Sequence, residues 1–172
     1  MHQKSILLAL NEINFEYIEA YIQKGFLPNF KKIFQQNGYV RTESEKEYKL
    51  LEPWIQWVTV HTGKTYEEHQ IFRLGDIVNA PHLDQLWNIA ERKGLTVAAV
   101  SPFNARNDLK NPLFFVPHPW TKTPASGSTL VKKLSKAICQ AVNDNAQEKI
   151  SLATAFAMLN GFLRNVPPSK FG

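Results

Sequence analysis

The sequence has little cysteine, no long apolar run and no block of charge of one sign. Cys139 is the single cysteine among 172 residues, so no internal disulfide can form, and this usage fits a reducing compartment. The apolar run at 6–10 is too short for the core of a secretory signal, and no small-residue cleavage site follows it. No stretch approaches the roughly 18 uninterrupted apolar residues of a membrane span. We therefore expect a soluble, cytoplasmic protein with no membrane partner.

The net charge of +5 is modest, and the basic residues are scattered along the chain. There is no arginine-rich run and no recognisable nucleic-acid-binding module, so a nucleic acid is not the expected partner. A mildly positive surface also suits a small anionic substrate, although solvated lysines with no partner explain the same distribution.

The length predicts one domain over residues 1–172, large enough to bury a core without disulfides or structural metals. An apolar content of 44% with 20% charged residues is ordinary for a globular protein and excludes wholesale disorder. Short apolar runs predict buried, largely parallel strands, and amphipathic segments ended by glycine predict helices between them. The expected fold class is therefore α/β, a three-layer sandwich with a largely parallel sheet and a right-handed βαβ crossover.

The predicted strands cover 5–10, 39–42, 95–100 and 113–116. The predicted helices cover 15–24, 28–36, 82–93, 129–143 and 151–165. Residues 54–61 fit either a buried helix or a buried strand, 43–49 a charged loop, and 117–128 an irregular segment. The helix at 151–165 is apolar on several sides, so it needs partners on several sides. We expect self-association, or a further C-terminal half of a longer protein, to cover it.

The segment 54–76, WIQWVTVHTGKTYEEHQIFRLGD, carries the most specific pattern in the chain. It resembles the signature "TG, two residues, Pro, two residues, His-Gly-Ile" that follows the nucleophile of alkaline-phosphatase-like hydrolases. The nearest branch is the type I phosphodiesterase/nucleotide pyrophosphatase group. The matching positions are Thr62, Gly63, Tyr66 in place of proline, His69, Gln70 in place of glycine, and Ile71. The segment LPNFKKIF at 27–34 resembles the helix "PNL..L...G" of the same group.

The resemblance implies an alkaline-phosphatase-like N-terminal half with a metal site at the carboxyl edge of the sheet. In that group the first strand ends in a metal-binding aspartate, and Asn11 and Glu12 stand at the matching place. The group's nucleophile, a serine or threonine, precedes a proline, and here Glu52 and Pro53 occupy that region without such a hydroxyl. No catalytic residue is therefore assigned. The implied cofactor is a divalent metal, zinc or manganese, held by Asn11, Glu12 and Glu52.

Each candidate residue also has a structural interpretation. Glu12 suits either a metal or substrate contact or a charge favoured by the dipole of the next helix. Glu52 is either a second carboxylate ligand or general base, or an ordinary loop carboxylate. Trp54 is either a substrate platform or a core residue. Arg106 either grips a phosphate or sulfate with its planar fork or lies in solvent.

Thr62, Gly63 and His69 are expected to be structural motif residues, with His69 anchoring its loop through hydrogen bonds. The sequence thus predicts a member of the metal-dependent phosphodiesterase/phosphatase-like hydrolase group that acts on an anionic ester. This copy is expected to be truncated and weakly active or inactive. The alternative is a non-catalytic α/β binding or assembly module that has lost the nucleophile.

Overall fold

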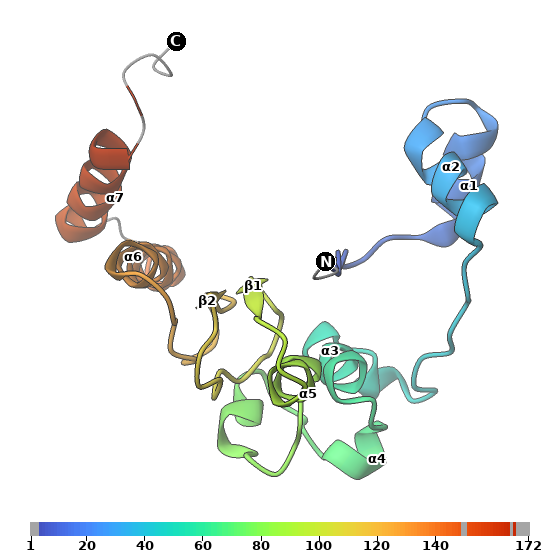
Figure 1. Ribbon diagram of the computed structural model, residues 1–172, viewed down its shortest axis with the longest axis horizontal. Coiled ribbons are helices and arrows are strands. Elements are labelled where there is room, and N and C mark those ends of the chain that lie inside the picture. Colours follow the sequence, from blue (N-terminus) through green and yellow to red (C-terminus); the bar gives the residue numbers. More distant parts are fainter. Residues whose placement is uncertain (1–3, 149–150, 166, 168–172) are drawn as a thin grey trace. The chain divides into compact units, whose positions relative to one another are not determined.

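A computed structural model describes residues 4–148, 151–165 and 167 of the chain (Figure 1). It divides into two compact units, Met1–Ser44 and Glu45–Gly172. The prediction of a single domain over 1–172 stays a prediction.

The first unit contains two helices whose ends follow local signals in the sequence. In α1 (Phe15–Gln23) the side chain of Asn14 accepts hydrogen bonds from the backbone N–H groups of Glu16 and Tyr17, at 2.8 and 3.2 Å. Pro28 opens α2 (Pro28–Asn37), and Gly38 ends it with a positive φ of 68°. Both predicted helices are confirmed to within one residue at each end.

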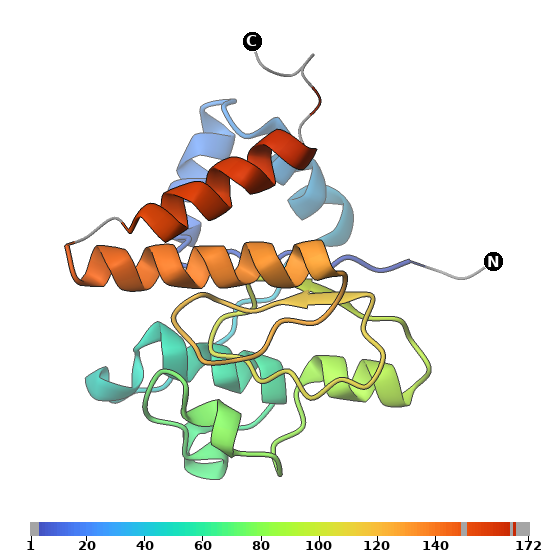
Figure 2. The ribbon, with the colours of Figure 1, turned by 90° about the vertical axis from the view of Figure 1, so that its left-hand side faces the viewer.

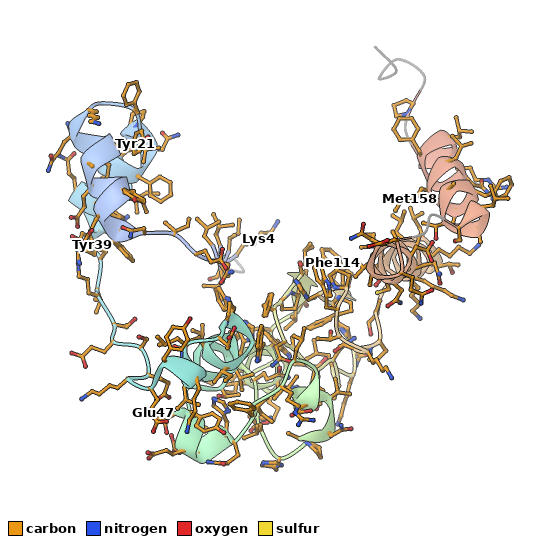
Figure 3. All side chains as sticks on the ribbon, turned by 180° about the vertical axis from the view of Figure 1, so that it is seen from behind. Lys4, Tyr21, Tyr39, Glu47, Phe114 and Met158 are labelled. Carbon is orange, nitrogen blue, oxygen red and sulfur yellow. The ribbon has the colours of Figure 1, made fainter. Side chains whose placement is uncertain are left out.

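Aromatic packing holds the first unit together. The ring of Tyr39 lies 4.5 Å from that of Phe34 and 5.6 Å from that of Phe15, between ring centroids. The Tyr39 hydroxyl donates to a carboxylate oxygen of Glu19 at 2.6 Å, and Arg41 donates to the same oxygen at 2.8 Å. Figure 3 labels Tyr21 on α1 and Tyr39 just after α2. Residues 39–42 follow the helices without forming a strand, so the strand predicted there is wrong.

The second unit begins with helices and short turns. Tyr48–Leu50 form the 3₁₀ helix η1, followed by α3 (Pro53–Thr62), α4 (Tyr66–His69) and the 3₁₀ helix η2 (Asp76–Asn79). Residues 54–61 are therefore helical, which decides between the two predicted alternatives. Val58 of α3 packs with Ile71, Ile77, Ala80 and Leu83 in one buried apolar cluster.

The rest of the second unit contains two strands between helices. Helix α5 (Leu86–Arg92) precedes β1 (Ala98–Val100) and β2 (Phe114–Val116), and Ala98 pairs with Phe114 in parallel register. The buried Phe115 of β2 packs against Trp87 of α5 with ring centroids 5.6 Å apart. Helices α6 (Thr129–Ala146) and α7 (Leu152–Asn165) complete the unit, and the views show α6 beside β2 (Figure 2).

The predicted three-layer α/β sandwich is wrong. The described residues are mostly helical, and their only sheet is the two-stranded β1–β2 pair. Residues 5–10 form no strand, and Ile6, Leu7 and Leu8 are exposed. The helix at 82–93 does lead into β1, but residues 39–42 form no strand before it, so the predicted βαβ crossover is also wrong. An apolar run becomes a strand only where a neighbouring strand binds its backbone, and a run of side chains carries no information about that neighbour.

The other predicted elements are confirmed in type, with changed ends. The strands at 95–100 and 113–116 shorten to β1 and β2, and the helix at 82–93 shortens to α5. The helix at 129–143 extends to Ala146, and the helix at 151–165 is α7. Residues 117–128 are irregular, apart from an antiparallel bridge between Ser126 and Phe115. No helix of the described residues is long and apolar enough to cross a bilayer.

Candidate functional site at the loop after β1

The start of α3 carries the first candidate residues. Glu52 is the N-cap of this helix in an extended conformation, and Pro53 occupies the first helical position, where its missing N–H costs nothing. The backbone carbonyl of Glu52 accepts from the N–H groups of Ile55 and Gln56, at 2.9 and 3.1 Å. Its side chain is exposed and makes no capping hydrogen bond. The Glu52 carboxylate therefore takes no part in capping the helix.

Asn104 attaches the loop after β1 to the first turn of α3. Its Nδ2 donates to the backbone carbonyl of Trp54 at 2.6 Å, and its Oδ1 accepts from the N–H of Gly75 at 2.8 Å. The side chain is fully buried and the residue has a φ of 43°. No role for Asn104 is predicted from the sequence. The available signal was that asparagine tolerates the left-handed region better than other non-glycine residues.

Trp54 is partly buried beside this joint. Its indole Nε1 donates to the backbone carbonyl of Phe72 at 3.0 Å, which ties α3 to the segment after α4. The structural role predicted for Trp54 thus has a specific contact. Its role as a substrate platform stays a prediction.

An aromatic cluster follows the carboxyl ends of both strands. Phe103 comes after β1, whereas His118 and Trp120 come after β2. The His118 ring centroid lies 4.3 Å from that of Phe103 and 4.5 Å from that of Trp120, on which it stacks. Partial burial lowers the pKa of His118 below its ordinary value, and its buried Nδ1 has no hydrogen-bond partner among the described residues. The two strand ends therefore bring a neutral imidazole between two aromatic rings.

His69 holds the turn that the family resemblance singles out. Its Nδ1 accepts from the N–H of Ile71 at 3.0 Å, so the other ring nitrogen carries the proton. That Nε2 lies 3.2 Å from Oγ1 of Thr59, to which it donates. Burial lowers the pKa of His69, so the ring is neutral at pH 7. Both nitrogens are engaged, which leaves His69 no lone pair with which to act as a base towards Thr59.

Thr62 and Gly63 end α3. The Thr62 hydroxyl donates to the backbone carbonyl of Val58 at 2.7 Å, and Gly63 adopts the left-handed conformation with a φ of 66°. These contacts are local and concern the end of the helix. Thr62 has no base beside its hydroxyl in the described contacts, so it is not an activated nucleophile.

Arg106 is buried, with 6% of its surface exposed. Its guanidinium donates to the backbone carbonyls of Ala80 and Leu83, and its Nε donates to Asp108 at 3.0 Å. Its own backbone exchanges two hydrogen bonds with the side chain of Gln85, each 3.0 Å long. This geometry makes Arg106 the centre of a buried network that joins the loop after β1 to the segment before α5. Binding of a phosphate or sulfate by Arg106 stays a prediction.

His61 lies between two tryptophans in the core of the second unit. Its ring centroid is 4.7 Å from that of Trp87 and 5.6 Å from that of Trp57. Burial lowers the pKa of His61 to about 4. Its buried Nδ1 has no hydrogen-bond partner within the described residues, and the ring packs against both tryptophans.

Asn11 and Glu12 belong to the first unit and Glu52 to the second. Both Asn11 and Glu12 are exposed, and Glu12 has a φ of 57° ahead of the Asn14 cap. Because the three residues divide between two units, their convergence on one metal stays a prediction.

The described residues contain no ready-made cluster of metal-binding side chains. In 4–148, 151–165 and 167, no group of three or more histidine, cysteine, aspartate or glutamate side chains is placed to hold a metal ion. A two-metal site needs several such donors within a few ångströms. We therefore derive no chemical step through a metal. Comparison with family models, curated proteins and solved structures finds no match to this chain.

Proposed function

We propose that this chain belongs to the phosphodiesterase-type hydrolase group and binds an anionic ester beside the start of α3. The observation that carries the proposal is the Asn104–Trp54 hydrogen bond. It fixes the first turn of α3 against the loop that leaves the carboxyl end of β1. Ligands of parallel sheets bind outside the carboxyl ends of the strands, and the N-terminus of a helix favours anions.

The residues around this joint suit an ester with one charged and one apolar part. The positive end of the α3 dipole favours a phosphate or sulfate oxygen. Trp54, together with the Phe103–His118–Trp120 cluster, offers aromatic surface for the alcohol part of the ester. Glu52 supplies a carboxylate at the helix start, suited to a metal ion or to a proton transfer.

Turnover by this polypeptide is expected to be low or absent. The hydroxyl of Thr59 is paired with a histidine that cannot accept its proton, and that of Thr62 donates within its own helix. Without an activated nucleophile, ester binding does not lead to a covalent intermediate.

The assay uses the purified chain with bis-p-nitrophenyl phosphate and zinc or manganese. Any metal-dependent release of nitrophenolate should be lost in Glu52→Gln and kept in the control Glu67→Gln, and Glu12→Ala tests separately whether a carboxylate of the first unit is needed. Glu67 is an exposed carboxylate in the first turn of α4. Release that survives both Glu52→Gln and Glu12→Ala contradicts the assignment of these carboxylates.

The second candidate is a non-catalytic binding or assembly module. It is favoured by the apolar surface that α7 leaves exposed, including Leu152, Phe156, Leu159 and Leu163. A chain that binds no ester but does bind a macromolecule through α7 would support the module in place of the hydrolase.

A further inference from the structure

Helices α6 and α7 form an antiparallel hairpin with a specific polar joint. Asp144, near the end of α6, accepts from the Thr154 hydroxyl at 2.7 Å, from the Ser151 N–H at 3.0 Å and from Gln140 at 2.7 Å. These hydrogen bonds keep the pKa of Asp144 far below its ordinary value. Farther along the pair, a Cβ built on Gly161 would lie 3.3 Å from a methyl carbon of Leu134. The glycine thus permits close approach of the two helices.

A groove of about 690 Å³ runs along this hairpin. Its lining comes from 129–140 of α6 and 153–164 of α7, which is about 18 Å or three turns of each helix. The apolar lining residues are Leu130, Leu134, Ala137, Ala153, Phe156 and Ala157. Figure 2 shows the two helices, and Figure 3 marks Met158 on α7. A three-turn apolar groove between two paired helices is long enough to bind a third helix.

The charged side chains that line the groove are all basic. Lys133, Lys136 and Arg164 line it, and no aspartate or glutamate does so among the described residues. Phe156 is 70% exposed, so the apolar floor is open to solvent in the absence of an occupant. An occupant that covers the floor and pairs with three cations must be apolar on one face and acidic along its flanks.

We infer that the α6–α7 groove binds an acidic amphipathic helix of a partner protein. The apolar face of that helix, with residues spaced at i, i+3, i+4 and i+7, covers Phe156 and the leucines of α6. Its flanking carboxylates pair with Lys133, Lys136 and Arg164. This surface lies on other elements than the ester site, so the two proposals succeed or fail separately.

The test uses a labelled synthetic peptide of about 15 residues, a length at which isolated helices begin to be stable. Leucines occupy one face of the peptide and glutamates flank them, and a twin peptide has lysine at each glutamate position. Fluorescence anisotropy should show the glutamate peptide binding the full chain at least about tenfold tighter than its twin. Amide shifts on ¹⁵N-labelled chain should be concentrated at the groove residues of α6 and α7.

Charge reversal distinguishes specific recognition of the acidic peptide from nonspecific binding. The triple variant Lys133→Glu, Lys136→Glu, Arg164→Glu should lose the glutamate peptide and gain the lysine peptide. Phe156→Ala should weaken binding about tenfold, whereas Phe162→Ala, on the same helix but outside the described lining, should leave it unchanged. Circular dichroism checks that each variant keeps its helices.

Four results would overturn the inference. They are equal binding of the two peptides, shifts that map elsewhere, glutamate-peptide binding that survives charge reversal, and a groove occupied by another ligand. That other ligand could be a second copy of the chain, shown by a dimer in light scattering that Phe156→Ala makes monomeric. It could also be a membrane, shown by binding to anionic vesicles without binding to the peptide.

Discussion

The side-chain amide of Asn104 bridges two backbone segments distant in sequence, donating to the carbonyl of Trp54 at 2.6 Å while accepting from the N–H of Gly75 at 2.8 Å. Through these two hydrogen bonds, one buried residue fixes the start of α3, the turn before η2 and the loop after β1 relative to one another. The candidate site depends on this joint.

Replacement of Asn104 by alanine should lower the free energy of unfolding by about 3 kcal/mol. The change removes both hydrogen bonds and leaves an alanine in the left-handed region at a φ of 43°. Urea unfolding followed by tryptophan fluorescence measures the effect. The exposed Asn143 in α6 is the control, and Asn143→Ala should be nearly neutral. Equal effects of the two substitutions would show that the Asn104 bridge is dispensable.

The stability of the second unit should fall as the pH falls below 6.5. In the folded chain the pKa of His61 is lowered by burial from 6.5 to about 4, so between these values the unfolded chain binds a proton that the folded chain does not. Each pH unit in this window should cost about 1.4 kcal/mol for this group. Burial also lowers the pKa values of His69 and His118, which adds to the same trend.

Phenylalanine at position 61 should remove part of that pH dependence. His61→Phe keeps an aromatic ring between Trp57 and Trp87 and titrates no proton, so its stability should fall less steeply between pH 6.5 and 4. Urea midpoints at several pH values give the slopes. His82→Phe, at an exposed position, provides the comparison. Parallel curves for His61→Phe and the original chain would contradict the burial of an uncharged His61.

Arg106 should not tolerate replacement by lysine. A lysine ammonium could not reproduce the fork that donates to the carbonyls of Ala80 and Leu83 and to Asp108, so Arg106→Lys should cost about 3 kcal/mol. Thermal unfolding measures the loss, with the exposed Arg73→Lys as the control. A variant that stays as stable as the original chain yet loses ester binding would instead identify Arg106 as the substrate-binding residue.

Position 63 should tolerate asparagine better than alanine. Its φ of 66° lies in the left-handed region, where a Cβ costs about 1–2 kcal/mol, although nothing lies within 4 Å of that position. Gly63→Ala should therefore lower the free energy of unfolding by about 1 kcal/mol, and Gly63→Asn by less. Chemical denaturation distinguishes the two. An alanine variant as stable as the asparagine variant would mean that the turn relaxes to another conformation.

Most of the longer helices were predictable because their signals are local, although residues 54–61 fitted either a helix or a strand until the structure showed α3. Pro28, Gly38, Pro53 and Gly63 each stand at a helix end and determine it through their own backbone preferences. The segments that form β1 and β2 were predictable, but the extent of the sheet was not, because a strand is defined by its neighbour. The apolar run at 5–10 has the composition of a buried strand, yet its leucines are exposed.

The roles of the candidate site residues were likewise predictable where the contacts are local and unpredictable where they are long-range. The anchoring role of His69 follows from a short-range motif, and its contacts to Ile71 and Thr59 agree with that role. The network of Arg106 with Ala80, Leu83 and Gln85 joins residues more than 20 positions apart, and no pattern in the sequence indicates it. Long-range polar contacts of this kind need the fold before they can be inferred.

The central claim is that an anionic ester binds where the first turn of α3 meets the loop after β1. The most direct measurement is a titration of ¹⁵N-labelled chain with bis-p-nitrophenyl phosphate, with and without zinc. The account predicts saturable shifts of the amides of Trp54, Ile55 and Gln56 and of the loop at 101–106, weakened in Asn104→Ala. Shifts scattered over surface lysines, or confined to the α6–α7 groove, would contradict it.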